Sequence, residues 1–252
     1  MRNSRFRNFL FWFLIFTINC GLSTINCLYA TPSTHIWAPA TDIQPYKKFH
    51  LTADFYVPVK ENDNGSWAAP VTNFGFTLGV LPYEKIQAEV GFDHIAGYGS
   101  ADSYPFYFNA KIGTPEDSLK KGVPAFVFGT YALGTKKDIT DYNIFYYKFA
   151  KTLPKIGKFS AGYYSGNEKL LLDTDGKADN GGILIAWEKV VSEISDKLWV
   201  CVDYQGGKNS FGALNLGFSW AFSSNTSVIF AYDIYNNSSI KPTYTTQVDI
   251  NF

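Results

Sequence analysis

Apolar and polar side chains alternate along most of this chain. The clearest example is its last nine residues (YTTQVDINF), in which Tyr244, Val248, Ile250 and Phe252 share one face of an extended strand while the other face is wholly polar. Twelve such runs occur, most of them close to the ~9–11 residues that a tilted membrane strand requires. They cover 49–57, 73–80, 86–93, 106–113, 123–134, 142–151, 158–166, 181–191, 198–205, 213–222, 227–235 and 244–252. The pattern predicts an all-β fold.

Charged residues help to orient the runs whose faces are both apolar. A Lys side chain that faces lipid at mid-membrane costs ~2–4 kcal/mol, so we expect Lys148 to point inward in 142–151, and Glu188 likewise in 181–191. The run 123–134 (VPAFVFGTYALG) is apolar on both faces and receives no orientation. Ile229 is the one apolar misfit on the inward side of 227–235.

The same parity predicts that ten charged side chains face the inside of a closed barrel. They are Asp54, Glu89, Asp93, Lys111, Lys148, Lys158, Glu188, Asp203, Asp233 and Asp249. Seven acids against three bases make the lumen negative and favour small cations. Alternatively, these groups close the lumen by pairing with one another, or they line a ligand pocket. Twelve strands lie between the roughly eight whose interior side chains fill and the roughly sixteen that leave a channel.

Most connectors agree with such a barrel, although 114–121 is long for a periplasmic turn and 206–210 is short for an outer loop. An even number of strands brings both chain ends to the periplasmic side, where turns are short. The runs 81–85 and 223–226 then become periplasmic turns, and the longest connectors, 58–70 and 167–180, become extracellular loops.

The N-terminus has the features of a secretory signal. Arg2, Arg5 and Arg7 precede an apolar core at 9–18 (FLFWFLIFTI), and Ala30 offers a cleavage point. The apolar core is shorter than the ~20 residues that span a bilayer. We therefore expect a cleaved signal peptide at 1–30. Its removal leaves 19 basic and 22 acidic residues, with Cys201 as the one remaining thiol and no disulfide framework.

Residues 31–46 (TPSTHIWAPATDIQPY) show no periodicity, and their prolines keep them out of a sheet interior. Three placements are consistent with this segment. It lies in the periplasm, it enters the lumen as a short plug with Trp37 as its anchor, or it forms a leader ordered only near Tyr46. The barrel itself is expected over 47–252.

Composition narrows the chemistry. Aromatic residues make up 18% of the chain and charged residues only 17%, against a usual charged share of about a quarter. The balanced charge gives no basic surface for nucleic acid. His94 lies beside Asp93, but no Ser follows it at the spacing of outer-membrane lipases, so we expect no catalytic residues.

The acidic stretch DTDGKAD (173–179) is the strongest candidate for a metal site. It places Asp173, Asp175 and Asp179 around Gly176, as in a calcium loop. The twelfth position of that loop requires Glu and holds Leu184 here. We therefore expect no metal site and no cofactor.

The final strand resembles the C-terminal assembly signal of bacterial outer-membrane barrels, carried by Tyr244, Val248, Ile250 and Phe252. With the signal segment and the twelve runs, residues 47–252 resemble bacterial outer-membrane β-barrel proteins of the porin-like kind. The resemblance implies a transmembrane antiparallel up-and-down β-barrel in the cell envelope of Gram-negative bacteria. Its implied partners are outer-membrane lipids and the barrel-assembly machinery, with small solutes as possible cargo.

The expected function is a narrow passive-diffusion channel with mild cation preference. The alternatives are a closed structural or surface-interaction barrel without transport and, less favoured, an outer-membrane enzyme. A soluble exported β-sandwich is the alternative at the level of fold. That fold would have to bury Leu214, Leu216, Phe218, Trp220 and Phe222 against a second sheet.

Overall fold

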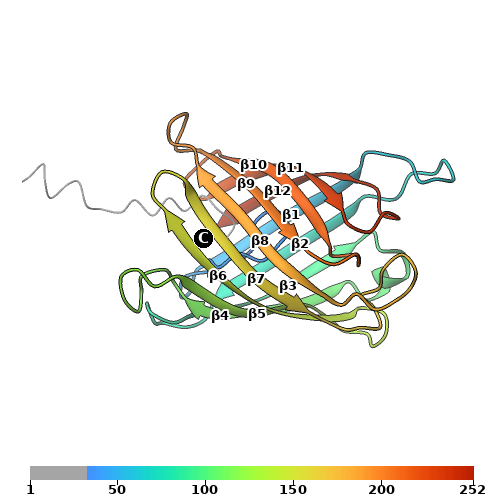
Figure 1. Cartoon of the computed structure of the whole chain (residues 1–252), viewed down its shortest axis with the longest axis horizontal. Helices are drawn as coiled ribbons and strands as arrows, with labels where there is room; N and C mark the ends of the chain where they lie inside the picture. Colours follow the sequence, from blue (N-terminus) through green and yellow to red (C-terminus); the bar gives the residue numbers. More distant parts are fainter. Residues whose placement is uncertain (1–32) are drawn as a thin grey trace, which may run out of the picture.

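Twelve antiparallel strands close into a barrel in the computed structural model, which describes residues 33–252 (Figure 1). The strands are β1 (Phe49–Pro58), β2 (Val71–Gly79), β3 (Gln87–Ala96), β4 (Phe106–Thr114), β5 (Ala125–Gly134), β6 (Asp141–Leu153), β7 (Gly157–Ser165), β8 (Gly181–Val190), β9 (Leu198–Gln205), β10 (Ala213–Ala221), β11 (Thr226–Tyr235) and β12 (Thr243–Asn251). The prediction of a twelve-stranded up-and-down barrel is confirmed. Strand ends differ from the sequence expectation by three residues or fewer.

The barrel closes between β1 and β12. Every strand pairs with its neighbours in sequence, and the first strand pairs with the last in a register that sets Leu51 opposite Ile250. The Phe252 N–H donates to the Phe49 carbonyl at 2.9 Å, so pairing continues to the last residue. Closure leaves no unpaired strand edge to aggregate.

The distribution of side chains is inverted relative to a water-soluble protein. The exterior is apolar and exposed, as at Phe74, Phe108, Phe145, Ile185 and Phe218, whereas polar and charged side chains are buried inside. An apolar band around a polar lumen is the arrangement of a transmembrane barrel of bacterial outer membranes. The β-sandwich alternative is therefore wrong, because Leu216, Phe218, Trp220 and Phe222 lie exposed on the outside instead of packing against a second sheet.

A bulge in β5 explains why its faces could not be assigned from sequence. Phe126 and Phe128 face outward and Val127 is buried inside. The register then shifts between Tyr131 and Leu133, and Ala132 takes a φ of 53°. One extra residue in a strand reverses the parity that follows it, so simple alternation fails across this run.

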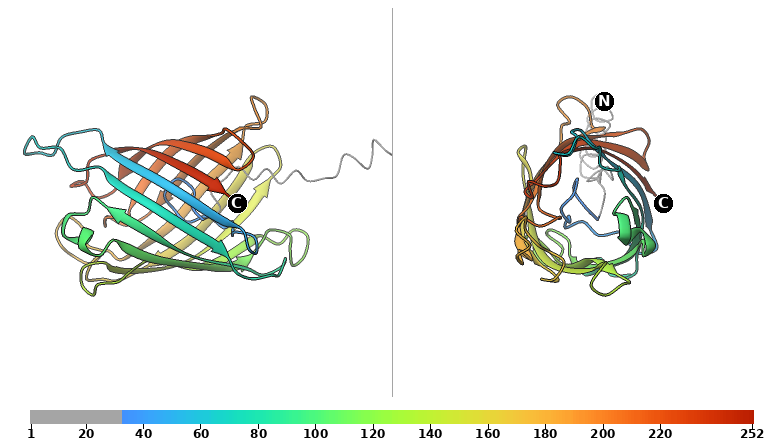
Figure 2. Two further views of the ribbon diagram at one scale, coloured as in Figure 1. Left: turned by 180° about the vertical axis from the view of Figure 1, so that it is seen from behind. Right: turned by 90° about the vertical axis from the view of Figure 1, so that its right-hand side faces the viewer.

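The two ends of the barrel differ in their connectors. The C-terminus lies at one end, and the long β1–β2 loop (59–70) extends from the other (Figure 2). The long β7–β8 loop (166–180) and the short 3₁₀-helix η1 (Gly99–Ser103) lie at the β1–β2 loop end. We call the end with Phe49 and Phe252 periplasmic and the opposite end extracellular, as in other such barrels.

No helix within residues 33–252 is long and apolar enough to cross a membrane. The predicted signal peptide at 1–30 lies outside the described residues.

Candidate functional site

The lumen holds the segment that precedes the first strand. Viewed along the barrel in Figure 2, this segment runs inside the ring of strands. Thr34 and Pro39 form an antiparallel bridge, and the His35 and Ala40 N–H groups donate to the Ala38 and Ser33 carbonyls at 2.9 and 3.1 Å. Residues 33–40 therefore form a short hairpin with Trp37 at its tip, and residues 41–46 lead from it to β1. We call residues 33–46 together the luminal hairpin.

Asp203 on β9 holds the hairpin tip. Its carboxylate accepts the N–H groups of Ile36, Trp37 and Ala38 at 2.8, 3.1 and 3.2 Å. The Asn215 side chain donates to the same carboxylate at 2.7 Å. Successive backbone N–H groups form a concave anion site of the kind called a nest, and here the anion is supplied by the barrel wall.

Glu89 on β3 holds the two arms of the hairpin at the periplasmic side. It accepts the Ser33 hydroxyl at 2.8 Å and the Gln44 N–H at 2.7 Å. Lys111 on β4 pairs with Glu89 at 3.3 Å and donates to the Ser33 and Asp42 carbonyls at 3.1 and 2.7 Å. Charge-assisted hydrogen bonds of this kind are about twice as strong as neutral ones.

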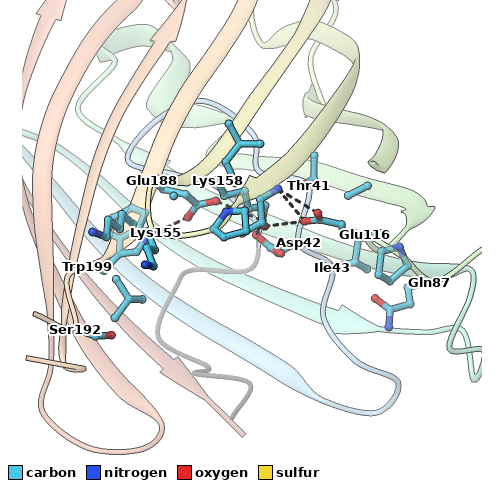
Figure 3. A pocket seen from close by; sticks show the side chains of 18 of the residues that line it. Thr41, Asp42, Ile43, Gln87, Glu116, Lys155, Lys158, Glu188, Ser192 and Trp199 are labelled. Carbon is cyan, nitrogen blue, oxygen red and sulfur yellow. Dashed lines mark hydrogen bonds and ion pairs between the residues drawn. The ribbon is translucent and has the colours of Figure 1, made fainter. Parts of the chain in front are cut away.

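The other two lumenal lysines also contact the hairpin. Lys148, fully buried on β6, donates to the Pro39 carbonyl at 2.8 Å. Lys158 on β7 lies between Asp42 at 2.5 Å and Glu188 at 3.3 Å (Figure 3). The sequence placed these lysines in the lumen, and the structure shows that all three act on residues 33–42.

His35 is buried at the centre of this charged cluster. Its Nε2 lies 3.3 Å from the Ser160 hydroxyl and its Nδ1 lies 3.8 Å from the Glu188 carboxylate. Burial, followed by the charges of Lys148, Lys158 and Lys111, holds the pKa of His35 well below its ordinary value. The imidazole is therefore neutral when the hairpin is docked.

Asp54 on β1 and Asp93 on β3 lie on the same wall as Lys111 but form no ion pair with it. Asp54 accepts from the Thr52 hydroxyl and from the Asn73 amide, the latter at 3.0 Å. Asp93 accepts the Asn73 and Asn109 amides at 3.2 and 2.9 Å. A ladder of alternating carboxylates and amides thus crosses β1 to β4.

The last two predicted lumenal carboxylates lie on the wall formed by β11 and β12. Asp233 accepts the Thr243 hydroxyl at 2.7 Å, and Asp249 pairs with His50 at 3.2 Å. Both are fully buried. Small inward residues of the wall leave room for the hairpin. At Gly79 the two are in close contact, since a Cβ there would lie 2.0 Å from the Pro45 carbonyl.

Two cavities flank the hairpin. A vestibule of about 990 Å³ opens at the periplasmic end, between the returning arm at 41–45 and the β6–β7 and β8–β9 turns (Figure 3). A smaller cavity of about 180 Å³ lies between the hairpin and the wall of β1 to β5, and we call it the side cavity. Asp54, Asp93 and their amide partners line the side cavity.

The predicted assembly residues face lipid rather than the lumen. Tyr244 is exposed and packs edge-on against Tyr232 with ring centroids 5.2 Å apart. Phe252 is also exposed, and Val248 and Ile250 share this outward parity. They form part of the outer surface near the β1–β12 seam.

The residues considered from sequence for catalysis or metal binding have structural partners. His94 lies on the outer face, edge-on to Phe106 at 5.2 Å. Asp173 accepts the N–H groups of Asp175 and Lys177, each at 2.9 Å, so it shapes its own turn. Within residues 33–252 no three His, Cys, Asp or Glu side chains are grouped to hold a metal ion.

Sequence reasoning missed the hairpin contacts of Ser33, His35 and Gln44. One usable signal was Ile229, the apolar misfit on an inward position. Ile229 packs in a buried cluster with Ile36, Trp199, Cys201 and Ala231. An apolar residue pointing into a polar lumen indicates that something apolar fills that lumen.

No family model and no curated protein matches the sequence. Among solved structures, the barrel is similar to an outer membrane channel from Pseudomonas putida F1, at 10% identity and a TM-score of 0.46, covering 83% of this chain and 97% of that one. It is also similar to the KdgM porin, at 7% identity and a TM-score of 0.48, covering 81% of this chain and 99% of that one. The NanC porin matches at 8% identity and a TM-score of 0.46, covering 80% of this chain and 98% of that one.

These similarities concern architecture only, because the identities are at or below 10% and the TM-scores below 0.5. The assignment rests on the chain's own strand pairing and its apolar exterior. Both make it a transmembrane β-barrel of the kind found in bacterial outer membranes.

Proposed function

We propose that this chain is a narrow outer-membrane channel through which small solutes diffuse passively, with a mild preference for cations. The observation that carries the proposal is the side cavity. The luminal hairpin fills one part of the lumen, while a space of about 180 Å³ with both polar and aromatic lining remains along β1 to β5. A solute would pass from this cavity to the periplasmic vestibule beside the hairpin arms.

The arrangement of charge supports the cation preference. Lys148 and Lys158 contact the hairpin and line no part of the side cavity, and Lys111, which does line it, is paired with Glu89. Asp54 and Asp93 also line it, and neither forms an ion pair within residues 33–252. A low-dielectric wall around uncompensated carboxylates raises the local concentration of cations.

A closed barrel without transport is the second candidate, favoured by how firmly the hairpin is held. Asp203, Glu89, Lys111 and Lys148 all hydrogen-bond to its backbone. In that case the extracellular loops would carry the function. We propose no catalytic role, and we propose that lipids and the barrel-assembly machinery are the partners that insert and surround the barrel.

Single-channel recording of the refolded protein in a planar bilayer, under a KCl gradient, tests the proposal. We expect discrete current steps and a reversal potential of the sign given by cation selectivity. The double variant Asp54→Asn with Asp93→Asn should move the reversal potential toward zero. Asp175→Asn removes an equal charge from the β7–β8 loop and should leave selectivity unchanged.

Two results would overturn the proposal. A heat-modifiable, correctly folded barrel that gives no current steps would establish the closed-barrel alternative. Current with anion selectivity would contradict the assignment of charge to Asp54 and Asp93.

A further inference from the structure

Aromatic side chains surround the extracellular part of the side cavity. Trp37 from the hairpin, Tyr56 from β1, Tyr107 from β4 and Tyr98 from the β3–β4 loop all line it. Tyr56 lies two residues beyond Asp54 toward the extracellular end of β1, and Tyr107 is the register partner of Asp93. The aromatic rings therefore lie directly next to the carboxylates.

The central aromatic side chain is fixed in place. The Trp37 indole N–H donates to the Phe211 carbonyl at 2.9 Å. Its ring lies between Tyr56 and Tyr235, with centroids 5.3 and 5.8 Å away and interplanar angles of 88° and 85°. Tyr107 is in turn stacked near Tyr142 at 6.4 Å. A rigid aromatic wall loses little conformational entropy when a ligand binds.

Within residues 33–252, the hydrogen bonds to the carboxylates beside this wall come from neutral side chains. Thr52 and Asn73 donate to Asp54, and Asn73 and Asn109 donate to Asp93. Neither Asp54 nor Asp93 forms an ion pair with a Lys, Arg or His side chain within residues 33–252, so a cationic ligand would displace no cation of the protein there. The side cavity therefore combines aromatic rings with two carboxyl groups that form no ion pair within residues 33–252.

We propose that the side cavity is a binding site for a small organic ammonium ion. This inference rests on the proposed channel function, and it names the class of solute that the channel would carry. Such a cation is attracted by aromatic rings through cation–π interactions and by carboxylates through charge. A strongly hydrated metal ion would use only the carboxylates. At about 180 Å³ the cavity is smaller than the ~300–1,000 Å³ pockets of drug-sized ligands, so it fits a compact ion.

Calorimetric titration of the refolded barrel in detergent with choline tests this site. We expect saturable binding of choline and none of 3,3-dimethyl-1-butanol, which has the same shape without the charge. Tyr98→Ala, which changes an exposed loop residue, should weaken choline binding about two- to fivefold, the range of a single exposed cation–π contact. Asp54→Asn with Asp93→Asn should weaken it at least as much, while Asp175→Asn should not change it.

The outcomes separate this site from the channel function. Choline binding by a barrel that gives no current would keep the site and overturn the channel. Cation-selective KCl current from a barrel that does not bind choline would keep the channel and overturn the site. Equal binding of choline and its neutral isostere would also overturn the site.

Discussion

The ring of Phe252 stacks on the ring of Phe49, with centroids 4.6 Å apart and planes 13° from parallel. The two backbones also bond reciprocally, at 3.3 Å from the Phe49 N–H and 2.9 Å from the Phe252 N–H. Phe49 continues to Phe76 at 5.9 Å, and Phe76 to Phe92 at 5.8 Å. The last residue thus joins an aromatic row that crosses the closing seam of the barrel.

Deletion of Phe252 should therefore impair membrane insertion while leaving export unchanged. The variant loses a stacked pair, which contributes about 0.5–1.5 kcal/mol beyond its buried area, together with two backbone hydrogen bonds at the seam. The measurement is the fraction of heat-modifiable barrel in membranes, with the exported but uninserted fraction counted separately. Phe222→Ala removes another exposed aromatic, from the β10–β11 turn, and serves as control. Normal insertion of the deletion variant would contradict a role for this residue in assembly.

Asp203→Asn should loosen the luminal hairpin and raise single-channel conductance. One carboxylate accepts three successive N–H groups of the tip, and hydrogen bonds to a charged group contribute about 1.5–3 kcal/mol each. The asparagine amide nitrogen cannot accept such a bond. The measurement is conductance together with protease cleavage within 33–46.

Asp233→Asn is the matched control for this prediction. It removes the same charge from the neighbouring wall, where the carboxylate accepts the Thr243 hydroxyl and no hairpin N–H. Unchanged conductance and protection in Asp203→Asn would show that the tip is held by packing instead. The Asp203 carboxylate already accepts three hairpin N–H groups, so we assign the proposed cation preference to Asp54 and Asp93 instead.

The barrel could be predicted from sequence because its signals are local. Strand alternation, short turns and the energetic penalty of a lipid-facing Lys148 or Glu188 each depend on a few neighbouring residues. The bulge at Ala132 could not be predicted, since both faces of β5 are apolar and no charge fixes the parity. The inward and outward faces of a strand could therefore be predicted from sequence wherever one face was polar.

The arrangement of the lumen was much less predictable. Parity places Lys148 and Asp203 on the inside, but it does not reveal which partner each one finds there. Both bind backbone atoms of residues 36–39, more than a hundred positions away in sequence. The partners are backbone N–H and carbonyl groups, which every residue has, so the sequence does not identify them. Among the sequence features, Trp37 and the misfit at Ile229 indicated an occupied lumen.

Acidification should release the luminal hairpin through His35. When docked, His35 has a pKa well below its ordinary value because of burial and the three nearby lysines. When released into water, it regains a pKa of about 6.5. Between these two values the released hairpin binds more protons, so docking is fully favoured above about pH 7.5 and weakens as the pH falls through 6.5.

Within that window the equilibrium for release should rise by up to about tenfold per pH unit. The measurement is conductance between pH 7.5 and 5, supported by protease cleavage of the hairpin. His35→Asn cannot titrate and should flatten the response. His94→Asn, on the outer face, should preserve it, and His50→Asn separates the second lumenal histidine, which pairs with Asp249. An unchanged pH response in His35→Asn would assign the release to another group.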